Sequence, residues 1–169
     1  NNTEPLLNNV IDKKAKQVNK TFFNFKKISQ KQSNLNFKNT LKHDLTTKSN
    51  LFDYDFFYNG GGVGIIDVNN DGLKDVFFCG NQVDNKLFIN KGNLVFEDIT
   101  ITANINQNKK WSNGVAIVDI NNDGWMDLYV TQGEPYKLNK RQNLLYINQK
   151  NNTFKEEAVK YGLADTGIS

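Results

Sequence analysis

Two nine-residue stretches share one pattern, Asp67-Val-Asn-Asn-Asp-Gly-Leu-Lys-Asp75 and Asp119-Ile-Asn-Asn-Asp-Gly-Trp-Met-Asp127. Each stretch places an oxygen-bearing side chain at positions one, three, five and nine, and a glycine at position six. Calcium takes roughly six to eight oxygen ligands at about 2.3–2.6 Å, and glycine at position six permits the positive φ that turns the chain around an ion. The pattern therefore predicts two calcium sites.

The predicted ligands are the same in both loops. Each loop supplies four side chains and the backbone carbonyl of position seven, and water completes the shell. The ligand set is Asp67, Asn69, Asp71, Leu73 and Asp75 in the first loop, and Asp119, Asn121, Asp123, Trp125 and Asp127 in the second. We expect a structural role for the calcium, which would close the hairpin between two strands and neutralise the clustered carboxylates.

The similarity continues beyond the loops. The loops begin 52 residues apart, whereas the later matching segments, Asn85–Asn90 and Asn143–Asn148, lie 58 residues apart. The second copy therefore carries six extra residues, within 131–142. Val-, Ile-, Phe- and Tyr-rich runs predict four strands in the first copy, at about 63–66, 76–79, 86–89 and 95–99. A period near fifty with short strands is typical of a β-propeller blade.

The sequence thus predicts an all-β protein, with two four-stranded antiparallel β-propeller blades that carry calcium loops. The expected divisions are a polar basic leader (1–50), a first blade (51–110) and a second blade followed by the start of another (111–169). Propellers close with about four to eight blades, so we expect the chain to be part of a larger propeller. Further blades or a partner chain would cover its outward faces.

An EF-hand is the main alternative for such loops, and the sequence argues against it. EF-hands need a bidentate Glu at position twelve and helices on both sides. Position twelve is Phe78 in the first loop and Val130 in the second, and strand-forming residues flank both loops.

The entry Gly60-Gly-Gly-Val-Gly-Ile-Ile-Asp67, the Asp71-Gly72 turn and the exit Asp75-Val-Phe resemble FG-GAP repeats, also called VCBS repeats. These repeats are the calcium-loop blades of integrin-α-like β-propellers. With Trp111-Ser-Asn-Gly-Val115 and Tyr161-Gly-Leu-Ala-Asp165, residues 52–169 are similar to bacterial VCBS-repeat proteins, many from Bacteroidota, that carry an ASPIC/UnbV domain. The resemblance implies a secreted or cell-surface protein, associated with the outer membrane.

Composition agrees with export. The single cysteine, Cys79, excludes an intrachain disulfide, and its apolar strand predicts a buried thiol. No stretch is apolar over the roughly twenty residues that a membrane span needs. Calcium loops with dissociation constants of about 10⁻⁴–10⁻³ M are occupied at the calcium concentrations found outside cells. No signal peptide is visible, so an exported chain would be a mature or trimmed sequence.

Charge is divided along the chain. Residues 1–50 carry ten lysines and three acidic residues, a net charge of +7, whereas the remainder has a net charge of −4. The leader is basic and contains Phe22, Phe23, Phe25 and Phe37, whose rings could stack on nucleic-acid bases. Nucleic-acid binding is therefore one hypothesis for this segment. No nucleic-acid-binding motif accompanies it, so we expect solvated lysines and phenylalanines that dock on the first blade.

Catalytic residues are scarce, because the only histidine, His43, lies in the polar leader. We therefore predict a non-enzymatic module that binds protein or glycan or serves as a scaffold. Two alternatives stay open. One is a propeller-borne polysaccharide hydrolase or lyase with catalytic groups partly outside these residues, and the other is a subunit of an outer-membrane complex.

Overall fold

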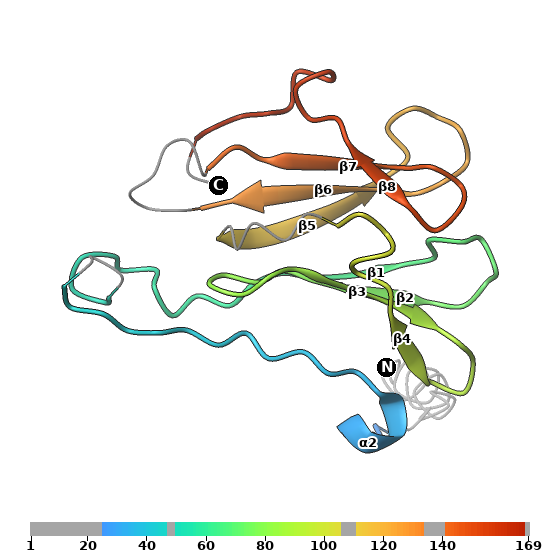
Figure 1. Cartoon of the computed structure of the whole chain (residues 1–169), viewed down its shortest axis with the longest axis horizontal. Helices are drawn as coiled ribbons and strands as arrows, with labels where there is room; N and C mark the ends of the chain where they lie inside the picture. The colour runs from blue at the N-terminus through green and yellow to red at the C-terminus, as the bar shows by residue number, and fades with distance from the viewer. Residues whose placement is uncertain (1–24, 47–49, 106–110, 134–140, 168–169) are drawn as a thin grey trace, which may run out of the picture.

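The computed structural model describes residues 25–46, 50–105, 111–133 and 141–167. Within these residues it contains one short helix, α2 (Gln30–Ser33), and eight β-strands (Figure 1). The strands of the first sheet are β1 (Val63–Ile66), β2 (Asp75–Phe78), β3 (Lys86–Asn90) and β4 (Phe96–Asp98). Those of the second sheet are β5 (Ser112–Val118), β6 (Asp127–Gln132), β7 (Leu144–Asn148) and β8 (Phe154–Glu156).

Each sheet is a four-stranded antiparallel meander, in the order β1-β2-β3-β4 and β5-β6-β7-β8. The predicted pair of four-stranded antiparallel sheets is thus confirmed, and the strands of the first sheet lie within one residue of their expected bounds. The register repeats as well, because Phe77 pairs with Gly64 and Leu87, and the equivalent Tyr129 pairs with Ala116 and Leu145. Of the region that holds the six additional residues, 134–140 lie outside the described residues.

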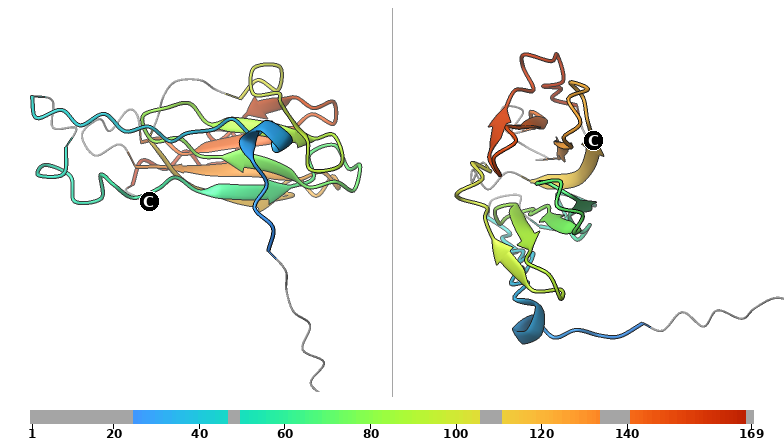
Figure 2. Two further views of the ribbon diagram at one scale, coloured as in Figure 1. Left: turned by 90° about the horizontal axis from the view of Figure 1, so that it is seen from below. Right: turned by 90° about the vertical axis from the view of Figure 1, so that its right-hand side faces the viewer.

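The two sheets stack face to face, with β1 beside β5 (Figures 1 and 2). The glycine-rich entry to β1 explains the close approach. A Cβ added at Gly62 would lie 2.8 Å from the Cα of Gly114, and one at Gly64 would lie 3.1 Å from Cγ1 of Val115. Side chains at these positions would force the sheets apart.

One apolar core fills the space between the sheets. From the first sheet it takes Phe77, Leu87 and Ile89, and from the second Leu128, Val130, Leu144, Tyr146 and Phe154. Most of these side chains are fully buried. The predicted buried thiol is confirmed, because Cys79 is 1% exposed in this core.

The outward face of the first sheet is covered by the segment before it. Leu35 and Phe37 pack on the cluster of Val76, Phe88 and Phe96, and the Phe37 ring stacks on that of Phe78 with centroids 4.7 Å apart. In Figure 1 this segment runs beneath the first sheet from α2. The expectation that all the leader phenylalanines dock is wrong for Phe25, which is 96% exposed. Phe22 and Phe23 lie outside the described residues.

The outward face of the second sheet is covered by the residues that follow β8. Tyr161, Leu163 and Ala164 pack on Leu145 and Ile147. The chain therefore shields the outer strands of both sheets itself, and the expectation of large bare faces is wrong for these strands. Exposure remains on the innermost strands, at Val63 and Ile65 of β1 and at Ala116 and Val118 of β5.

Candidate metal centres

The first predicted loop connects β1 to β2, and its side chains hold its own backbone. Asp67 accepts hydrogen bonds from the N–H groups of Asp71 (3.1 Å) and Gly72 (3.0 Å). Asp71 Oδ1 accepts from Leu73 N–H at 2.8 Å. Asn70 (φ +56°) and Gly72 (φ +85°) adopt left-handed conformations, which Asn and Gly tolerate best. The turn brings positions one, three and five to one side.

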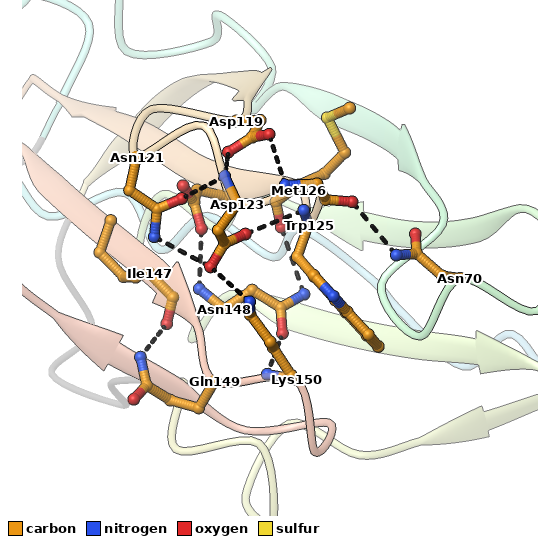
Figure 3. A network of polar contacts seen from close by, with 12 residues as sticks. Asn70, Asp119, Asn121, Asp123, Trp125, Met126, Ile147, Asn148, Gln149 and Lys150 are labelled. Carbon is orange, nitrogen blue, oxygen red and sulfur yellow. Dashed lines mark hydrogen bonds and ion pairs between the residues drawn. The ribbon is translucent and has the colours of Figure 1, made fainter.

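The second loop, between β5 and β6, repeats this geometry (Figure 3). Asp119 accepts from Asp123 N–H at 3.0 Å and from Gly124 N–H at 2.8 Å. Asp123 Oδ1 accepts from Trp125 N–H at 2.9 Å, and Asn121 Nδ2 donates to Asp123 Oδ2 at 3.1 Å. Since the same contacts recur, the conformation is dictated by the shared residues.

Position nine, Asp75 or Asp127, lies behind the loop and is fully buried. Asp75 accepts from the N–H groups of Val68 and Asn90, each at 2.8 Å. Asp127 accepts in the same way from Ile120 (3.1 Å) and Asn148 (2.8 Å). Burial raises the pKa of both carboxyl groups; the two N–H donors oppose the shift, and the loop's other carboxylates add to it. Each aspartate therefore joins its loop to the third strand of the sheet.

Asn90 and Asn148 are structural residues of the loops that sequence reasoning left without a role. Asn90 Nδ2 donates to the carbonyl of Lys74 at 3.1 Å, and Asn148 Nδ2 donates to that of Met126 at 3.3 Å. Both asparagines are buried. Their recurrence at the end of Asn85–Asn90 and Asn143–Asn148 was the signal that could have identified them.

The two loops lie side by side at one end of the stacked sheets and contact each other. Asn148 Nδ2 also donates to the carbonyl of Val68, the residue after Asp67, at 2.8 Å. Asn70 Nδ2 donates to the carbonyl of Gly124 at 3.2 Å (Figure 3). Each loop is thus held partly by the other repeat.

The chemistry of the donor set fits a hard cation, since every predicted side-chain ligand carries oxygen. A carboxylate offers about four lone-pair sites, so an oxygen that accepts one N–H can still bind an ion. In the described part of the chain, no three Asp, Glu, His or Cys side chains are placed so that they could hold a metal ion. Calcium binding would require the loop side chains to turn further inward. No contact of the Leu73 and Trp125 carbonyls identifies them as ligands.

A cavity of about 460 Å³ lies away from the loops, between the segment before the first sheet and the β2–β3 connection. Phe37, Lys38, Lys42 and Lys86 contribute to its lining. Two hydrogen bonds join the segments that form its walls. Asn81 N–H donates to Asn39 Oδ1 at 3.1 Å, and Gln82 Nε2 donates to the Lys42 carbonyl at 3.2 Å. The size is that of a small-ligand pocket.

Comparison with known proteins supports the fold. Residues 67–130, which include both loops, match the model of the FG-GAP-like repeat. Together with the two antiparallel four-stranded sheets, this match identifies the sheets as two β-propeller blades. No helix in the described residues is long and apolar enough to cross a membrane.

The chain is also similar to cartilage acidic protein 1 of several animals. It is 32% identical to the Xenopus tropicalis protein over 88 residues, which is 51% of this chain and 14% of that protein. It is 31% identical to the mouse protein over 80 residues (47% and 12%) and 31% identical to the human protein over 83 residues (48% and 13%). The matched part of the chain thus spans about one seventh of these relatives or less.

Proposed function

We propose that this chain is a pair of calcium-stabilised blades within a larger propeller, and a non-enzymatic binding or scaffold module of an extracellular or cell-surface protein. The observation that carries the proposal is the repetition of one oxygen-lined loop, with the same hydrogen bonds, at the same end of two stacked sheets. Two independent stretches of sequence converge on one loop geometry, and the oxygen donors that both carry are of the kind that a hard cation prefers.

In this proposal, bound calcium neutralises the carboxylates that each loop gathers. Asp67 and Asp71 in the first loop, and Asp119 and Asp123 in the second, would face the ion. Asp75 and Asp127 would join the ion to the third strand through their N–H partners on Asn90 and Asn148. The fold would then depend on an ion that extracellular fluids supply at millimolar concentration.

The exposure of the innermost strands supports neighbouring blades or a partner chain. Val63 and Ile65 are 55% and 56% exposed, whereas their equivalents in the second repeat, Val115 and Ile117, pack against the core. The face of β1 that carries Val63 and Ile65 therefore points away from the second sheet, whereas the equivalent face of β5 packs against the first sheet. A further blade on that face of β1 would repeat the contact already present between the two sheets.

Similarity to animal proteins named for cartilage supports an extracellular setting and a role without catalysis. A relation to bacterial VCBS proteins with an ASPIC/UnbV domain, and to an outer-membrane complex, stays a prediction. The lysine-lined cavity beside Phe37 is a candidate place for a ligand of the module.

Thermal unfolding with calcium and with chelator tests the proposal. A ligand that binds only the folded state at a hundredfold excess over its dissociation constant stabilises it by about 2.7 kcal/mol per site. Asp71→Ala and Asp123→Ala should each remove part of the calcium-dependent rise in melting temperature. Asp55→Ala, at an exposed position outside the loops, is the matched control and should leave the rise intact. Superimposable melting curves with calcium and with chelator would refute the proposal.

A further inference from the structure

The hairpins that follow β3 and β7, residues 91–95 and 149–153, differ in sequence, and one of the differing positions lies beside the loops. Gly92 in the first repeat corresponds to Lys150 in the second, and both adopt left-handed backbone conformations (φ +90° and +65°). Both backbone N–H groups donate to the preceding asparagine, Asn90 or Asn148, at 2.9 Å. The backbones therefore agree at this position, and they diverge after it, because Asn93 is left-handed (φ +54°) and its equivalent Asn151 is not. Beside the loops, the second hairpin presents a lysine side chain where the first has none.

That side chain reaches the second loop. Lys150 Nζ lies 3.3 Å from Oδ2 of Asp123, the fifth position of the loop (Figure 3). Burial raises the pKa of Asp123, but the Trp125 N–H and the Lys150 ammonium outweigh it, and the net pKa is lowered. An ammonium group thus sits at a carboxylate that the second loop would offer to calcium.

The first loop has no such ion pair among the described residues. Lys91, next to Gly92, pairs with Glu97 at 3.5 Å rather than with Asp71. Lys74, at position eight of the first loop, forms no ion pair with a described residue. The two loops therefore carry the same oxygen donors, and they differ in that a lysine pairs with the fifth-position aspartate of the second loop.

The surroundings of Lys150 add to the difference. A cavity of about 310 Å³ beside the second loop is lined by Asp123, Lys150, Lys155, Lys160 and Glu157. Glu157 is already paired with Lys155 at 2.7 Å and with Lys160 at 2.6 Å. A Lys150 side chain displaced from Asp123 would enter a space that two other lysines line.

We propose that Lys150 is a tethered cation that competes with calcium at the second loop, so that the first loop fills at lower calcium concentration. The inference rests on the proposed calcium binding. A single positive charge about 5 Å from a divalent ion opposes its binding even in a water-like dielectric, and salt reduces the effect. We expect the second loop to bind calcium about tenfold more weakly than the first.

An exchange of the two residues tests the inference on the whole chain, by calcium calorimetry at low salt. Lys150→Gly gives the second hairpin the residue of the first, and should bring the two dissociation constants within about threefold of each other. Trp125, at position seven of the second loop, reports that loop through its fluorescence. The calcium midpoint of this signal should fall in the Lys150→Gly variant.

The reciprocal variant, Gly92→Lys, should weaken the first loop. Because a side chain at φ +90° strains the backbone, Gly92→Gln is the control that separates strain from charge. Lys155→Gln removes a positive charge from the same cavity without touching Asp123, and should change the second loop's affinity less than Lys150→Gly. If every variant binds two calcium ions with unchanged affinities, the inference is overturned and the proposed function stays intact. Absence of calcium binding in every variant would overturn both.

Discussion

The two repeats share their strands, register and loops, yet equivalent positions lie in different surroundings. Phe77 of β2 is fully buried between the sheets, whereas its equivalent on β6, Tyr129, is half-buried on the outward face. Conversely, Ile65 of β1 is 56% exposed, and its equivalent on β5, Ile117, packs against the core. The residues of each repeat define the blade, but the neighbouring sheet decides how much each position contributes to stability.

The largest expected difference concerns the central positions of β2 and β6. Phe77→Ala removes a fully buried ring and should lower the free energy of unfolding by about 3–5 kcal/mol. Tyr129→Ala acts on the outward face and should cost about 1–2 kcal/mol. Urea denaturation of both variants measures the two values. Equal costs would mean that the outward face of the second sheet is covered as completely as the inward face of the first.

The two buried asparagines behind the loops, Asn90 and Asn148, should also contribute unequally to the free energy of unfolding. Asn148 donates to carbonyls of both repeats, at Val68 and Met126, whereas the side-chain amide of Asn90 donates to Lys74 in its own repeat. Leaving a buried carbonyl unsatisfied costs about 1–3 kcal/mol. We therefore expect Asn148→Ala to destabilise the chain about 1 kcal/mol more than Asn90→Ala, as measured by chemical denaturation with chelator present. The reverse order would show that the contact between the repeats contributes little.

Smaller effects are expected on the innermost strands. Ile117→Ala should cost about 1–2 kcal/mol, because the side chain packs against the core. Ile65→Ala should change stability by less than about 0.5 kcal/mol in this chain, because Ile65 is mostly exposed. If a longer form of the protein places another blade on β1, the cost of Ile65→Ala in that form should rise toward that of Ile117→Ala.

The reactivity of Cys79 offers a test by chemical modification in place of denaturation. Burial raises the pKa of its thiol to about 12, so only about one molecule in ten thousand carries the reactive thiolate at pH 8. A thiol reagent such as dithionitrobenzoate should therefore modify Cys79 only when the sheets separate. A cysteine at the equivalent, half-buried position, through Thr131→Cys in a Cys79→Thr background, should react faster. Equal, rapid reaction of the native thiol would mean that the core between the sheets opens readily.

Sequence periodicity was sufficient for the strands and the loops, because short β-runs and an Asp-x-Asn-x-Asp-Gly turn are local features. It was insufficient for Asp75 and Asp127, which were predicted only as ligands and which the fold also buries as acceptors for two backbone N–H groups. The docking of Phe37 on the first blade was expected and is confirmed, but the cover that Tyr161 gives to the outward face of the second blade was missed. Those features depend on contacts between segments distant in sequence, which local patterns do not encode.

Calorimetric titration of the chelator-treated chain with calcium tests the central claim most directly. The account predicts two bound calcium ions per chain, with Asp71→Ala removing one and Asp123→Ala removing the other. Heats of dilution alone, with the chain still folded by circular dichroism, would show that the loops hold their shape through their own hydrogen bonds and would contradict the calcium assignment.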